Sequence, residues 1–201
     1  MHKLGKCFLA GLAAVALIPI AGASQEEQKP TTTSVPVSAA PAGVSDSLPP
    51  MEDPATVDQI KDYLRLSGEI DSFRASWIAA VDKNRSIGAP YWPESFWTAI
   101  KEEMQKTDLM PMYIVFYQHG ISRGLMHEVL DAYQRLGADH FRGSPECFKL
   151  GDAVSLMSAD WERIKLAKTR ETISRVYAVY KPQMKAARAR YLAEHPGWVD
   201  K

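Results

Sequence analysis

The segment from Leu109 to Phe141 constrains the fold of this chain most, because it carries more local structure signals per residue than any other part. Asp108 is a predicted N-cap, and Pro111 suits a first helical turn, where its missing N–H leaves no hydrogen bond unmade. Gly120 predicts the end of this short helix. The segment is therefore expected to begin with a short helix followed by a tight turn.

The spacing of apolar residues predicts a second helix in the same segment. Ser122 is its expected N-cap, and Gly137 offers the C-terminal stop. Between them, apolar side chains recur at spacings of three and four residues: Leu125, Met126, Val129, Leu130, Tyr133 and Leu136. This pattern is typical of a helix that buries one face against its neighbours.

This layout of short helix, tight turn and amphipathic helix resembles the core of domain-of-unknown-function family 2059, a set of small, mostly helical, exported bacterial proteins. The positions that carry the resemblance are Pro111, Tyr113, Ser122, Leu125, Leu130 and Tyr133. They are packing and turn residues. The resemblance therefore implies a helical fold and an exported location, and it supplies no active-site residue.

Residues 1–23 predict a cleaved secretory signal peptide. Lys3 and Lys6 precede an apolar run over residues 8–20, and residues 21–23 have the small-x-small form that signal peptidase accepts. That run is too short for a mature membrane helix, which needs about 20 apolar residues, and no later segment comes close. The mature chain is expected to be periplasmic or secreted, without a transmembrane segment.

Two further regions follow the signal peptide. Residues 24–50 are rich in Thr, Ser, Ala, Val and Pro and contain no aromatic residue, which predicts a disordered linker. From Met51, charged and large apolar residues alternate, which marks one helical domain over residues 51–201. The predicted fold class is all-α: a small helical bundle with a long C-terminal helix, preceded by the signal peptide and the linker.

Helices are also expected on the N-terminal side of the central segment. Thr56 and Gln59 predict a capping box for a helix that Gly68 ends, and the next helix is expected to pack on it as an antiparallel hairpin. A third helix is predicted over residues 94–106. Tyr91 and Trp92, in the loop before it, are expected to plug the end of the bundle.

The C-terminal region predicts one long helical pattern. Ser144 and Pro145 indicate a helix start, and the pattern then continues over residues 151–181 with a phase slip near Lys165. The slip fits either one helix that crosses two packing partners or a break at that point. Pro182 must kink or end the helix, because it removes the hydrogen bond to residue 178.

Positive charge is concentrated in this last helix. The chain has 24 Lys and Arg and 24 Asp and Glu in total, but residues 163–191 contain nine basic residues and a single acid, Glu171. The helix could neutralise acidic helices of its own or a sister subunit, form a solvated face, or contact anionic lipid, glycan or another polyanion. Nucleic acid is not expected as a partner of an exported chain. The candidate interaction face consists of Arg175, Lys181, Lys185, Arg188 and Arg190.

No catalytic, metal or cofactor site is predicted. Cys147, the single cysteine after signal removal, is a candidate reactive thiol, since a helix N-terminus can lower a thiol pKa; a buried, inert cysteine is the alternative. Thioether and imidazole groups that could suit Cu(I) occur together at Met110, Met112, His119, Met126 and His127, but without a four-ligand spacing. Nucleophile-elbow, phosphate-loop and dinucleotide motifs are also missing, so no enzyme is predicted.

These features predict a non-catalytic protein-interaction or assembly module of the bacterial periplasm or envelope. Its partner would be an unidentified protein or a second copy of itself, and an anionic envelope surface is a further candidate. The alternative is a carrier that binds a small molecule or lipid between its helices. A carrier requires an apolar cavity, whereas an interaction module can be well packed.

Overall fold

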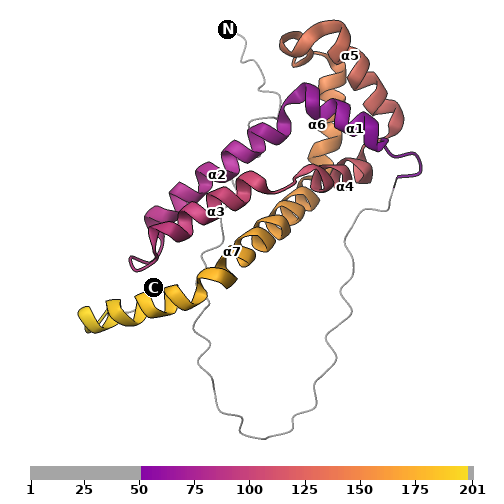
Figure 1. The fold of residues 1–201 in the computed structure, drawn as a ribbon. Helices are drawn as coiled ribbons and strands as arrows, with labels where there is room; N and C mark the ends of the chain where they lie inside the picture. Colours follow the sequence, from indigo (N-terminus) through magenta and orange to yellow (C-terminus); the bar gives the residue numbers. More distant parts are fainter. Residues whose placement is uncertain (1–50, 199–201) are drawn as a thin grey trace, which may run out of the picture.

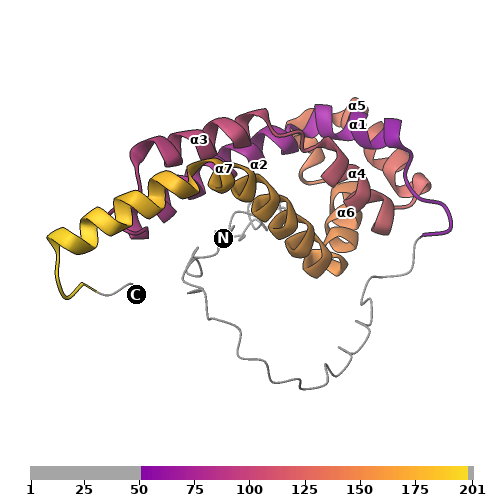
Figure 2. The ribbon, with the colours of Figure 1, turned by 60° about the horizontal axis from the view of Figure 1, so that its bottom comes forward.

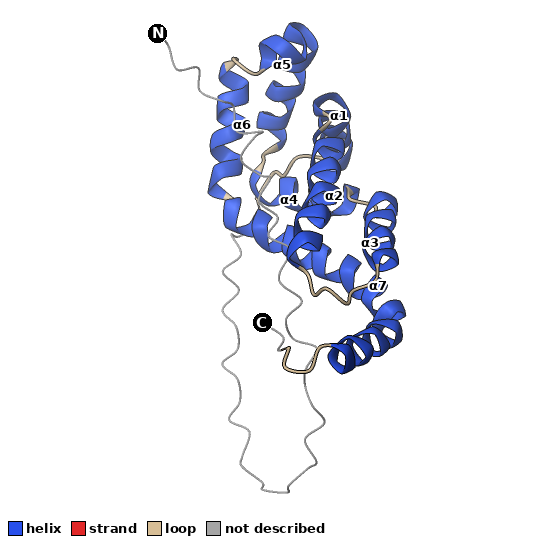
Figure 3. Ribbon diagram, turned by 90° about the vertical axis from the view of Figure 1, so that its left-hand side faces the viewer, coloured by secondary structure: helices blue, strands red, loops and turns tan. Residues whose placement is uncertain are grey.

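The computed structural model describes residues 51–198, which form seven α-helices and contain no strand of a sheet (Figure 1, Figure 3). The helices are α1 (Val57–Ser67), α2 (Glu69–Ile87), α3 (Glu94–Lys106), α4 (Met110–Gly120), α5 (Arg123–Phe141), α6 (Pro145–Leu156) and α7 (Ser158–Glu194). The predicted all-α class, with a long C-terminal helix, is confirmed. The predicted signal peptide (1–23) and linker (24–50) lie outside the described residues, as do residues 199–201.

The start and end of α1 follow from its capping residues. Thr56 Oγ1 accepts a hydrogen bond from the N–H of Gln59 at 3.2 Å, and the Gln59 side chain accepts one from the N–H of Thr56 at 3.0 Å. This is the predicted capping box. Gly68 then adopts a left-handed conformation with φ 64°, which glycine tolerates because it has no Cβ. Since α2 begins at the next residue, Gly68 forms a sharp elbow between the two helices.

The predicted hairpin of the first two helices is wrong. α1 packs mainly on α5, with further contacts to α4, whereas α2 runs along α3 (Figure 1). The elbow at Gly68 directs the two helices away from each other and towards different neighbours. Both helices have the expected apolar stripes, but a stripe does not specify which neighbour will cover it.

The central segment folds largely as predicted. Asp108 Oδ1 accepts a hydrogen bond from the N–H of Met110 at 3.0 Å, although the residue at the N-cap position is Leu109. Ser122 caps α5 by accepting a hydrogen bond from the N–H of Leu125 at 3.2 Å. Gly137, with φ 72° and ψ 163°, interrupts α5 and so ends its amphipathic part.

A cluster of aromatic rings from α2, α4 and α7 lies within the core. The Trp161 ring centroid lies 4.9 Å from that of Tyr113, 4.6 Å from that of Phe116 and 6.0 Å from that of Phe73. Nearby, Trp77 Nε1 donates a buried hydrogen bond to Thr169 Oγ1 at 3.1 Å, which joins α2 to α7. Because buried aromatic side chains dominate core energetics, this cluster fixes the relative positions of the three helices.

The C-terminal helical region breaks at Met157 and is continuous at Lys165. Residue 157 lies between α6 and α7, and α7 then runs through both Lys165 and Pro182. The break brings Met157 against the end of α4, where an added Cβ on Gly120 would lie 1.8 Å from Met157 Sδ. No glycine or proline marks position 157 in the sequence. The break therefore coincides with a contact between helices and with no breaker residue.

Pro182 bends α7 without ending it. Figure 2 shows the second half of α7 running at an angle to the first half. Pro182 is exposed, and the carbonyl of Ala178, one turn earlier, lies on the same exposed side of the helix. The hydrogen bond that Pro182 removes therefore belongs to a carbonyl that water can reach, which makes the proline tolerable there.

The contact between α4 and Met157 generates a stability prediction. Replacing an exposed helical glycine with alanine normally stabilises a helix by about 0.5–1 kcal/mol. Gly120→Ala should instead destabilise the protein by about 1–3 kcal/mol, because the new methyl group overlaps Met157. Urea denaturation measures this change in the free energy of unfolding.

Two variants make the test specific. Gly151→Ala places its Cβ in open space and should show the ordinary stabilisation. In the double variant Gly120→Ala/Met157→Ala, the loss of stability should be smaller than the sum of the losses in the two single variants, because the truncated side chain no longer meets the new methyl group. If Gly120→Ala stabilised the protein as Gly151→Ala does, the proposed contact would be wrong.

Candidate functional site

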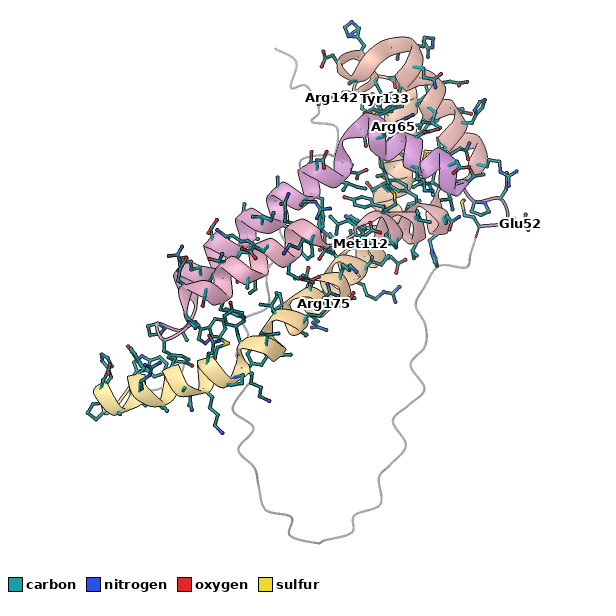
Figure 4. All side chains as sticks on the ribbon, in the orientation of Figure 1. Glu52, Arg65, Met112, Tyr133, Arg142 and Arg175 are labelled. Atoms are coloured by element: carbon teal, nitrogen blue, oxygen red, sulfur yellow. The ribbon has the colours of Figure 1, made fainter. Side chains whose placement is uncertain are left out.

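The first half of α7 has its positive charge largely balanced within the chain. Arg163 pairs with Asp160 at 2.6 Å, and Lys168 pairs with Glu171 at 3.2 Å. Arg175, labelled in Figure 4, bonds to Glu171 and also donates from Nε to Glu103 Oε1 on α3 at 2.9 Å. This arrangement supports the interpretation that the basic helix neutralises acids of its own chain. It also places Arg175 of the predicted interaction face in a contact that ties α7 to α3.

Lys165 shows how strongly this half of α7 belongs to the core. Its side chain is only 2% exposed, yet its ammonium group pairs with Glu162 one turn earlier. The same Nζ lies 5.7 Å from the centroid of the Trp161 ring. A buried cation needs such compensation, because transfer out of water is unfavourable without a partner.

The second half of α7 presents a different charge pattern. Lys181, Lys185 and Arg190 are exposed and make no ion pair with any other described residue. Arg188 is exposed as well, and no Asp or Glu occurs between residues 172 and 193. We refer to Lys181, Lys185, Arg188 and Arg190 as the cationic face. It contains four of the five residues predicted from the sequence.

Helical spacing arranges the cationic face along two edges. Lys181, Lys185 and Arg188 are related by i, i+4 and i+7, so they lie in a row on one edge of α7. Arg190 lies on the opposite edge. Between the two edges the outward surface carries exposed small residues and Pro182: Ala178, Pro182, Ala186, Ala189 and Ala193.

Aromatic contacts hold this part of α7 on the bundle. The Tyr180 ring centroid lies 5.8 Å from that of Phe96 on α3, and Met184 is buried at 5% exposure. Near the end of the helix, the Tyr191 ring lies 5.8 Å from that of Tyr91 and 5.3 Å from that of Trp198. The cationic face is thus presented by a supported helix.

The two loop aromatics pack as the sequence predicts. Trp92 lies against Phe96 and Trp97, with ring centroids 5.5 Å and 5.3 Å away. Tyr91 instead contacts the end of α7 through Tyr191. Both residues are half-buried, so they close the end of the bundle.

The candidate thiol lies at the predicted position, in the first turn of α6. The N–H of Cys147 donates to Ser144 Oγ at 3.1 Å, which confirms Ser144 as the N-cap. The Cys147 side chain is half-buried and packs against the core. Whether this thiol is reactive or inert stays a prediction.

Sequence reasoning missed a half-buried carboxyl group at the elbow between α1 and α2. Glu69 is the first residue of α2, and its Oε2 accepts a hydrogen bond from the Tyr117 hydroxyl at 2.6 Å. The Tyr113 hydroxyl donates to the Glu69 backbone carbonyl at 3.4 Å. Burial raises the pKa of Glu69 to about 7, against a smaller lowering by the Tyr117 hydrogen bond.

The tyrosines around Glu69 serve as neutral hydrogen-bond donors. Burial raises the pKa of Tyr113, Tyr117 and Tyr63, and the nearby negative charge of Glu69 raises each further. Their hydroxyls therefore keep their protons at neutral pH. An acidic residue in the first turn of a helix is usually interpreted as a surface residue whose charge interacts favourably with the helix dipole. The spacing of Tyr113 and Tyr117, one turn apart on α4, is the signal that could have indicated a polar partner.

The methionines and histidines considered for copper lie in different local surroundings. Within residues 51–198 no group of three His, Cys, Asp or Glu side chains is placed to hold a metal ion. Met112 and Met126 are buried in the core. The His119 ring is 3.0 Å from the Val115 carbonyl, and His127 is 3.5 Å from Asp131, so each histidine has a local contact.

Comparison with protein-family models, with curated proteins and with solved structures found no significant match to this chain. The resemblance to family 2059 stays a prediction. Among the helices of the described part, none is both long enough and apolar enough to cross a bilayer.

The half-buried carboxyl generates a pH-dependence prediction. The pKa of Glu69 is about 7 in the folded protein and near its ordinary value of 4.5 in the unfolded chain. The folded state therefore binds the proton more tightly, and this contribution to stability is complete below pH 4.5 and is lost as the pH rises through 7. Glu69→Gln should remove this loss of stability, so its effect on the free energy of unfolding should be about 3 kcal/mol more favourable at pH 8 than at pH 4.5.

Urea denaturation of both proteins between pH 4.5 and 8 measures the difference, and titrating groups that they share cancel in the comparison. Tyr117→Phe is a useful second variant. This substitution removes the hydrogen bond that lowers the Glu69 pKa, so the Glu69 carboxyl should titrate at a higher pH. Parallel stability curves for wild type and Glu69→Gln would contradict the assignment.

Proposed function

We propose that this chain is a non-catalytic protein-interaction or assembly module of the periplasm or envelope, and that it contacts its partner through the cationic face. The main support for this proposal is that the two halves of α7 differ in how their positive charges are neutralised. Up to Arg175 the cations are largely neutralised inside the chain, whereas Lys181, Lys185 and Arg190 are directed to solvent without a described counter-ion. Complementary charge across an interface provides specificity and faster association.

The support beneath the cationic face also favours a binding role. Tyr180 packs on Phe96 of α3 and Met184 is buried, so only the long side chains of the face need to become ordered on binding. A pre-organised surface loses less conformational entropy when it binds. The predicted signal peptide and the resemblance to an exported family support the location.

The alternative function, a carrier of a small molecule or lipid between the helices, stays a prediction from the sequence. No observation on residues 51–198 favours it over the interaction role.

Cross-linking in intact cells that make the protein tests this proposal. With a lysine-reactive cross-linker, links to other proteins should concentrate at Lys181 and Lys185. Three other exposed lysines, Lys61, Lys83 and Lys106, lie on other helices and provide the comparison. Lys181→Gln/Lys185→Gln/Arg190→Gln should lose the complex in native mass spectrometry and leave the thermal unfolding temperature unchanged within a few degrees, because exposed charges contribute little to stability.

The matched control is Lys61→Gln/Lys83→Gln/Lys106→Gln, which changes the net charge by the same amount. It should keep the complex. Links spread evenly over all five lysines, or equal loss of the complex in both triple variants, would contradict an interaction through the cationic face.

A further inference from the structure

Four aromatic rings gather at the far end of α7. They belong to Tyr91 in the loop before α3, to Tyr191 in the last turn of α7, and to His195 and Trp198, which follow the helix. We propose that these four rings, which we call the aromatic platform, bind a saccharide by stacking on its pyranose rings. This site is separate from the cationic face and does not depend on the function proposed for that face.

A tight turn after α7 places Trp198 in the aromatic platform. The N–H of Trp198 donates to the carbonyl of His195 at 3.1 Å, which closes a turn of four residues. Pro196 suits the second position of such a turn, and Gly197, with φ 104°, suits the third, where a left-handed backbone favours glycine. Because the turn reverses the chain, the indole packs back onto the end of the helix.

The rings of the platform contact one another and stay partly uncovered. The Trp198 ring centroid lies 5.3 Å from that of Tyr191 and 5.7 Å from that of Tyr91, with interplanar angles of 83° and 86°. The His195 ring stacks on Tyr191 at 4.1 Å. His195 is exposed and the other three residues are half-buried. The rings therefore hold one another in place while part of their surface faces solvent.

Polar atoms lie at the edges of these rings. The Tyr191 hydroxyl and the Trp198 indole N–H make no hydrogen bond with another residue of the described part of the chain. His195 Nδ1 lies 2.9 Å from the Tyr191 carbonyl oxygen. Since a carbonyl only accepts, Nδ1 carries the proton, and Nε2 of the neutral ring is left as an acceptor. The platform therefore combines ring faces with hydrogen-bond donors and an acceptor.

A saccharide has the chemistry that matches this combination. The C–H groups on one face of a pyranose ring are attracted to the negative face of an aromatic ring. The hydroxyl groups around the same pyranose ring both donate and accept hydrogen bonds, as the edges of the platform require. Tyrosine and tryptophan also give a large contact area with only two side-chain torsions to fix, so little conformational entropy is lost on binding.

Two other classes of ligand fit the platform less well. A quaternary ammonium group is held inside a cage of rings, within about 6 Å of each ring centroid. The rings of Tyr91, Tyr191 and Trp198 already contact one another, so they fill the space that a cation would occupy. A purely apolar ligand would cover the indole N–H and the tyrosine hydroxyl without giving them partners, which is unfavourable.

Saturation-transfer difference NMR on the full chain tests the proposal. The probes are chitotetraose and cellotetraose, two β-1,4-linked tetrasaccharides, and glucose serves as the free sugar. At least one tetrasaccharide should receive saturation from the protein. The signal should be strongest at the C–H protons of one pyranose face, because those protons lie against the aromatic rings. Titration of the same tetrasaccharide gives its dissociation constant.

Variants of the platform locate the site. Trp198→Ala should weaken tetrasaccharide binding about ten-fold, as expected when an aromatic anchor is truncated. Tyr191→Phe keeps the ring and removes the hydroxyl, so binding should weaken about three-fold. The matched controls are Phe148→Ala, at an exposed aromatic residue on α6, and Tyr177→Phe, earlier on α7. Each control should change the affinity by less than roughly two-fold.

The variant Lys181→Gln/Lys185→Gln/Arg190→Gln separates this site from the cationic face. It should keep its affinity for the tetrasaccharide although it loses the protein complex, so either proposal can fail while the other stands. Circular dichroism confirms that each variant keeps its helix content. If Trp198→Ala loses helix content, Tyr191→Phe decides, because it leaves the ring in place.

Three results would overturn the proposal. Absence of saturation transfer to all three sugars would show that the platform only closes the end of the bundle. Affinity that is unchanged in Trp198→Ala and Tyr191→Phe, or reduced as much in the matched controls, would place saccharide binding elsewhere. Loss of saccharide binding in the triple variant alone would assign the saccharide to the cationic face.

Discussion

The packing of Trp161 against Phe73, Tyr113 and Phe116 is the contact on which the rest of this fold depends. It joins the start of α7 to α2 and α4, which lie far apart in the sequence. Because these rings bury large areas, the cluster fixes where α7 leaves the core and therefore where its second half is presented. The arrangement also accounts for the buried Lys165, whose stem follows the same helix face and whose charge is met by Glu162 and the indole ring.

Local features of this fold could be predicted from the sequence because they depend on neighbouring residues. The capping box at Thr56, the caps at Ser122 and Ser144, and the interruption at Gly137 each involve groups within a few residues. Their chemistry is the same in any fold. The concentration of positive charge in α7 was equally visible, since charge can be counted along the chain.

Features that depend on distant partners could not be predicted. The α1–α2 hairpin was wrong because the stripe on α1 is covered by α5, some 60 positions later in the chain. Met157, where the helical region breaks, lies against Gly120 of α4, and the raised pKa of Glu69 comes from its burial in the folded chain. Likewise, the division of α7 into a neutralised and a cationic half required knowing that Glu103 of α3 reaches Arg175.

The exposed proline in α7 has a consequence for cooperativity. The hydrogen-bond ladder is interrupted at Pro182, so the two halves of α7 are joined by one backbone hydrogen bond fewer than in an uninterrupted helix. Units that share few contacts unfold at different free energies. The second half of α7 therefore depends for its position on its own contacts, through Tyr180, Met184 and Tyr191, and less on the helix before Pro182.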